Sequence, residues 1–139
     1  MAHKKKSWAE KMNPHATWFV EKTTKKIADM PAGCMMLVAT PLLVENYIKS
    51  IPFGHTANVQ QMRKDLAANF HAEFTCPLTS GIFLRIVAEK AFEELGQGKR
   101  KEEVAPFWRI LNRKSTTIKK LSFDYAFIHE MRSQEGIPD

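Results

Sequence analysis

The chain has 139 residues, of which 44% are hydrophobic and 26% are charged, and this ordinary globular composition excludes collagen-like, low-complexity and wholly disordered proteins. The formal net charge is +6, and the excess is localised: residues 97–121 carry eight basic and two acidic side chains, and residues 1–30 carry seven and three. Localised positive charge favours binding to phosphate or another polyanion, with a solvated lysine-rich surface as the alternative.

No apolar run approaches the roughly 18–20 residues that a membrane span requires, and no secretory signal follows the basic N-terminus. Two cysteines, Cys34 and Cys76, are too few for a disulfide scaffold, so we expect a cytoplasmic protein in a reducing compartment. The histidines and cysteines lack metal-ligand spacing, so the sequence predicts neither a metal nor another cofactor. We expect a monomer that makes no membrane contact.

Residues 1–40 are predicted to form a basic leader, an added N-terminal helix and a short strand. The pair Asn13-Pro14 is a typical helix start, the apolar spacing continues to Met30, and an apolar run over 35–39 indicates the strand. Residues 41–139 form the main predicted domain. Its expected helices cover about 41–50, 58–69, 79–95 and 123–134, and strands 107–111 and 117–121 pair as a basic hairpin.

Two helices followed by a charged β-hairpin are the outline of a winged helix-turn-helix. The sequence therefore predicts an α+β fold, mostly helical, with a small hairpin as the wing. In such a domain the second helix of the pair enters the major groove and the hairpin contacts the DNA backbone.

Four short segments stand out: residues 44–54, which end in Ile-Pro-Phe-Gly; 85–88, Arg-Ile-Val-Ala; 106–110, Pro-Phe-Trp-Arg-Ile, followed by Asn112; and 131–137, Met-Arg-Ser-Gln-Glu-Gly-Ile. In this order they resemble segments of the DNA-binding domain of the O6-alkylguanine-DNA alkyltransferases, and especially of the alkyltransferase-like proteins that lack the reactive cysteine. The resemblance implies duplex DNA as the partner, with alkylated or extruded bases as targets in DNA repair. It also implies that Arg85 holds the gap left by a flipped nucleotide.

The departures from this family bear on catalysis. The reactive cysteine of the family falls at Phe107, and the histidine that activates it falls at Trp108. Alkyl transfer needs a thiolate, which phenylalanine cannot supply. The family tyrosine after the Ile-Pro-x-Gly turn is also missing, since Val59 lies there. We therefore predict a binding protein without alkyltransferase activity and no catalytic residue.

The predicted binding residues follow from the charge, the helix–hairpin outline and the resemblance. Phe107 and Trp108 are expected to form an aromatic base pocket, on opposite faces of a strand, with Trp108 the better candidate. Arg85 could equally form a surface pair with Glu89 four residues on. The predicted DNA contacts are Arg63, Lys64, Thr79, Ser80, Arg85, Arg109, Arg113, Lys114, Lys119 and Lys120.

Two other classes of protein stay open. One is a protein-interaction module that keeps the fold without DNA binding and recruits a repair protein through its N-terminal helix and acidic C-terminal tail. The other is a cysteine-dependent alkyl acceptor that uses Cys76, because a thiol just before a helix can have a lowered pKa.

Overall fold

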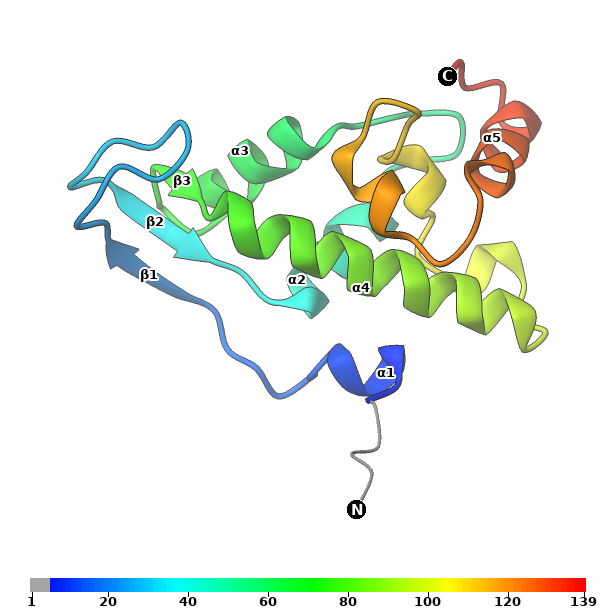
Figure 1. Ribbon diagram of the computed structural model, residues 1–139, viewed down its shortest axis with the longest axis horizontal. Coiled ribbons are helices and arrows are strands. Elements are labelled where there is room, and N and C mark those ends of the chain that lie inside the picture. The colour runs from blue at the N-terminus through cyan, green and yellow to red at the C-terminus, as the bar shows by residue number, and fades with distance from the viewer. Residues whose placement is uncertain (1–5) are drawn as a thin grey trace.

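The computed structural model describes residues 6–139 and has a mixed α+β fold, as the sequence predicts, with a small sheet at one end of a long helix (Figure 1). The α-helices are α1 (Trp8–Lys11), α2 (Pro41–Lys49), α3 (Val59–Asn69), α4 (Pro77–Gly96) and α5 (Tyr125–Gln134). The strands are β1 (Phe19–Lys22), β2 (Met35–Val38) and β3 (Phe74–Thr75), and the short 3-10 helices are η1 (Lys101–Glu103), η2 (Phe107–Arg109) and η3 (Thr116–Lys120). No helix within this part of the chain combines the length and the apolar character needed to span a bilayer.

The segment after α1 forms a strand where the sequence predicts a helix. β1 pairs antiparallel with β2, with Phe19 opposite Val38, and β2 pairs parallel with β3. The helix predicted from Asn13 to Met30 is therefore wrong, and the strand predicted over 35–39 is confirmed as β2. Asn13 has a φ of 42°, outside the right-handed helical range. The Phe-Val-Glu-Lys sequence of β1 suits a pleated surface, and the apolar strand β2 provides the hydrogen-bonding partner.

The four helices predicted after residue 40 are confirmed as α2, α3, α4 and α5. Three of them begin at a side chain that accepts a hydrogen bond from a backbone N–H of the first turn. Thr40 accepts from Leu43 N at 3.2 Å before α2, and Asn58 accepts from Gln61 N at 2.8 Å before α3. Asp124 does the same before α5. These caps satisfy donors that have no partner within the helix, so they set where each helix begins.

The predicted hairpin over 107–121 is wrong. Its two strands are the 3-10 helices η2 and η3, and no β-pairing joins them among the described residues. The carbonyl groups of this segment find a different partner, because Arg132 of α5 donates to Trp108 O at 2.9 Å and to Leu111 O at 3.1 Å. The Asn112 and Ser115 side chains close the connection with local hydrogen bonds. These carbonyl groups therefore have hydrogen-bond partners without β-pairing.

The main core lies between α2, α4, α5 and the segment around η2. Its members include Val44 and Ile48 of α2, Leu84 and Val87 of α4, Ile128 of α5, and Phe107, all fully buried. α1 packs on α4 from the side opposite η3 in the view of Figure 1. This packing leaves one face of the first half of α4 uncovered, and that face forms the site described next.

Candidate nucleic-acid interface

A groove runs along the uncovered face of α4, between α1 and η3. Leu78 and Ile82 point out of this face, 67% and 55% exposed, and Arg85 follows one turn later on the same side. The cavity has a volume of about 460 Å³. We name it the α4 groove; it is lined by Trp8, Lys11, Pro77, Leu78, Gly81, Ile82, Arg85, Ile86, Thr116, Thr117 and Lys120.

Arg85 is half-buried in this groove, and its charge is not neutralised by a neighbouring carboxylate. Its guanidinium carbon lies 5.3 Å from the centroid of the Trp8 ring, and its Nε is buried without a hydrogen-bond partner among residues 6–139. The alternative pair with Glu89 does not form. The buried Glu89 carboxylate accepts from the backbone N–H of Ser122 at 3.0 Å and from its hydroxyl at 2.6 Å. Glu89 therefore does not neutralise the guanidinium charge of Arg85.

A second hollow of about 320 Å³ adjoins the α4 groove on the side of α3, and the two share Pro77, Gly81, Thr116 and Thr117. It adds Lys114 and the polar side chains of Asn58, Gln60 and Asn112. None of the described residues that line either cavity is acidic. The surface around the first half of α4 is therefore concave and positively charged, which concentrates the field on an incoming anion.

The structure brings Arg85, Lys114 and Lys120, of the predicted DNA contacts, to this surface. Lys119 is exposed beside Lys120. Arg113 is exposed and forms an ion pair with Asp139 at 3.3 Å. The hydrogen bond from Tyr125 lowers the pKa of Asp139, and burial acts in the opposite direction. Hydrogen bonds from His129 and Arg113 lower this pKa further. The charge of Arg113 is therefore partly neutralised by Asp139.

Other predicted contacts lie elsewhere or are enclosed. Arg63 donates to Thr75 O at 3.0 Å and pairs with Asp29 at 3.2 Å, in a separate hollow that it shares with Lys64 and Glu73. Ser80 is fully buried and donates to Cys76 O at 2.6 Å. The Thr79 hydroxyl is also buried, without a partner among the described residues. The hydroxyl of Ser80 is thus committed to the helix start.

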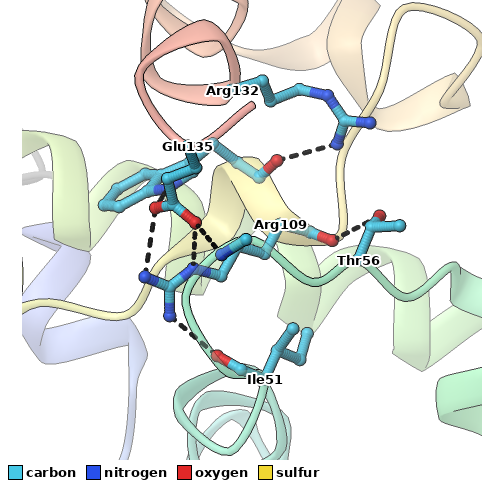
Figure 2. A network of polar contacts seen from close by, with 7 residues as sticks. Ile51, Thr56, Arg109, Arg132 and Glu135 are labelled. Carbon is cyan, nitrogen blue, oxygen red and sulfur yellow. Dashed lines mark hydrogen bonds and ion pairs between the residues drawn. The ribbon is translucent and has the colours of Figure 1, made fainter. Parts of the chain in front are cut away.

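Arg109 sits in a polar network at the end of α5 (Figure 2) and does not line the α4 groove. Its guanidinium donates to Glu135 through Nε at 2.8 Å and Nη2 at 3.0 Å, and to Ile51 O through Nη1 at 2.7 Å. Glu135 also accepts from Gly54 N at 2.8 Å and from Trp108 Nε1 at 2.6 Å. Three of the four segments that carry the family resemblance thus meet at one carboxylate. The Arg109 side chain is 15% exposed and its charge is paired, so its role here is structural.

The pKa of Glu135 reflects this network. Burial alone would raise it, but the hydrogen bonds from Arg109, Gly54 and Trp108 favour the charged carboxylate and hold the pKa below the ordinary value of 4.5. The carboxylate is therefore ionised at neutral pH.

The two aromatic residues of the expected base pocket are core residues. Phe107 is completely buried, and its ring contacts those of Phe123 and Phe127. Trp108 is 1% exposed and forms part of the wall of a hollow of about 240 Å³ that also contains Glu135. Because η2 is a 3-10 helix, the two side chains do not alternate between opposite faces of a strand.

The two cysteines lie in a small separate core cluster with Met30 and Met36. Both are free thiols, and Cys76 is only 6% exposed. The described residues contain no group of three or more histidine, cysteine or acidic side chains that could hold a metal ion.

Sequence reasoning missed Trp8 and Lys11, which form the outer wall of the α4 groove. They belong to α1, whose start is a capping box: the Ser7 hydroxyl accepts from Glu10 N, and the Glu10 carboxylate accepts from Ser7 N, both at 3.1 Å. The Ser-x-x-Glu spacing is the signal that predicts a helix start at this point.

Comparisons with protein-family profiles, curated proteins and solved structures give no match. The family resemblance therefore stays a prediction.

Proposed function

We propose that this protein binds duplex DNA and catalyses no reaction on it. The α4 groove and the hollow beside it carry the proposal, because Arg85, Lys114 and Lys120 meet there without a carboxylate among the lining residues. Phosphate contacts supply most of the affinity in non-specific DNA binding. A concave basic surface can contact the convex backbone of a duplex at several points, whereas isolated surface lysines cannot.

The helices α3 and α4 would act as the two helices of a helix-turn-helix, with the exposed face of α4 toward the major groove. The segment from Asn112 to Lys120 would serve as the wing, although η3 is not a strand. Its lysines would contact the backbone. The resemblance to alkyltransferase-like proteins supports this arrangement, and it adds alkylated or extruded bases as candidate targets.

The absence of a nucleophile at the family's reactive position supports a binding role. Phe107 stands there, fully buried, and it has no group that could accept an alkyl chain. Cys76, the other candidate acceptor, is buried in a small apolar cluster and is only 6% exposed, which restricts access to its sulfur.

The test is fluorescence anisotropy with two matched duplexes, one plain and one carrying O6-methylguanine, over a series of salt concentrations. We expect salt-dependent binding to both, and tighter binding to the modified duplex if the predicted damage recognition holds. Lys120→Glu and Lys114→Glu should each weaken binding to both duplexes and lower the slope of affinity against salt by about one.

Lys25→Glu is the matched control, because Lys25 is exposed in the loop between β1 and β2 and lines neither cavity. It makes the same change in net charge. If it weakens binding as much as Lys120→Glu, the α4 groove is not the interface. If the wild type does not bind either duplex at low salt, the proposal is wrong.

A protein-interaction module is the second candidate, favoured by apolar side chains around β1. Trp18 and Phe19 are 45% and 49% exposed, and β1 is an edge strand of the sheet. Exposed apolar groups on a sheet edge are typical of a contact surface. Binding that is unchanged by the charge reversals in the α4 groove would favour this candidate.

A further inference from the structure

The α4 groove combines apolar walls with cations, and a fully paired duplex offers no base face to the apolar walls. Trp8, Leu78 and Ile82 give it apolar walls, and Leu78 and Ile82 are more than half exposed. Lys11, Arg85 and Lys120 place three cations around the same cavity. A paired duplex offers phosphates to the cations, but the apolar faces of its bases are stacked on one another.

Trp8 is placed to receive a flat ligand. It is half-buried against α4, and α1 is held in shape by the capping box of Ser7 and Glu10. The Lys11 ammonium lies 4.1 Å from the ring centroid of Trp8, on a side chain that is otherwise exposed. Exposed cation–π contacts are weak, so a ligand can displace this one and place its phosphate on the same ammonium.

We propose that the α4 groove binds an unpaired nucleotide, with its base against Trp8 and Ile82 and its phosphates on Lys11 and Lys120. A volume of about 460 Å³ is adequate for a ligand of this size. Base–aromatic stacking on such platforms tolerates any base sequence. This proposal rests on the proposed DNA binding, and it assigns the base to a place distinct from Phe107 and Trp108, which are enclosed in the core.

The experiment compares three labelled DNAs of the same sequence by anisotropy at one salt concentration: a fully paired duplex, a duplex with a single bulged nucleotide, and the single strand. We expect the wild type to prefer the bulged duplex over the paired one by about tenfold, as one stacked base would give. Trp8→Ala should reduce this ratio to about one, because the aromatic platform for the unpaired base is lost. Trp8→Phe, which keeps an aromatic face, should retain most of the preference.

A second variant avoids any change to α1. A Cβ built at Gly81, which lines the groove, meets no atom within 4 Å, so Gly81→Leu can project into the groove without a clash at its Cβ. It should abolish the preference for the bulged duplex. Gly96→Leu is the matched control, because Gly96 lies in the same helix, also has open space around its Cβ, and does not line the groove.

Equal wild-type binding to the paired and bulged duplexes would overturn this inference and leave the proposed DNA binding intact. A preference that survives both Trp8→Ala and Gly81→Leu would also overturn it. Failure to bind any of the three DNAs would overturn the proposed function itself. A peptide of alternating glutamate and leucine carries the same two chemistries, and tighter binding of that peptide than of the bulged duplex would overturn the inference too.

Discussion

Arg109 and Glu135 form a two-point ion pair, with Nε to Oε1 at 2.8 Å and Nη2 to Oε2 at 3.0 Å. The two residues are 26 apart in the chain, and the Glu135 side chain is only 5% exposed. Together with Ile51 and Gly54, they join the end of α2 and the turn after it to η2 and the end of α5. The pair therefore holds together three segments that pack around the core.

Removing Glu135 should destabilise the fold strongly. Glu135→Ala leaves the Arg109 guanidinium partly buried without its counter-charge, and breaking a buried ion pair in this way costs about 3–5 kcal/mol. Urea denaturation measures the change in the free energy of unfolding. Glu130→Ala is the control, since Glu130 lies on α5, is exposed and, within residues 6–139, accepts only from Gln134, so a loss below about 0.5 kcal/mol is expected. Equal effects of the two substitutions would contradict the structural role of the pair.

The same carboxylate gives a pH dependence of known sign. Its pKa is lower in the folded chain than its ordinary value of 4.5, so its stabilising contribution is complete above that value and is lost as the pH falls through the folded pKa. The difference in unfolding free energy between the wild type and Glu135→Gln should be constant at higher pH and become smaller below about 4.5. Other carboxylates are common to both proteins and cancel. A difference that does not change with pH would rule out this assignment.

Two glycines should respond to alanine in opposite directions. Gly81 lies inside α4 with open space around its Cβ, so Gly81→Ala should stabilise the protein by about 0.5–1 kcal/mol. Gly54 has a φ of +78°, so Gly54→Ala should destabilise it by about 1–2 kcal/mol. The Cβ at Gly54 would make only ordinary contact, at 3.6 Å from Glu135 O, so the loss comes from the backbone angle. Thermal unfolding of both variants checks the prediction; a gain in stability from Gly54→Ala would show that this turn is not strained.

The thiols should be inert in the native protein. Cys34 and Cys76 are 4% and 6% exposed, so a thiol reagent should modify them at least about tenfold more slowly than in the unfolded chain. Intact mass measurement after incubation with O6-methylguanine DNA should show no added methyl group. A stoichiometric methyl group that disappears in Cys76→Ala would establish the cysteine-dependent alkyl acceptor and contradict a purely binding role.

Local signals were sufficient for the helices after residue 40 and for the concentration of positive charge. Thr40, Asn58 and Asp124 cap helices through hydrogen bonds that span only two or three residues. The starts of these helices can therefore be predicted from the local sequence. Strand β2 could likewise be predicted from its apolar run. Arg85, Lys114 and Lys120 were identified as candidates because they lie on or near the basic segment and the long helix.

Distant contacts decided the rest. β1 is a strand because β2, which begins 13 residues after β1 ends, pairs with it, and the helical spacing of 14–30 carries no information about that partner. The expected hairpin gave way to 3-10 helices because Arg132, 21 and 24 residues away, takes the carbonyls of Leu111 and Trp108. The ion pair of Arg109 with Glu135 and the contact of Trp8 with Arg85 also join distant parts of the chain, so the sequence alone did not predict them. A charged or aromatic side chain has a strong local chemistry, but its role depends on which partner the folded chain places within a few ångströms of it.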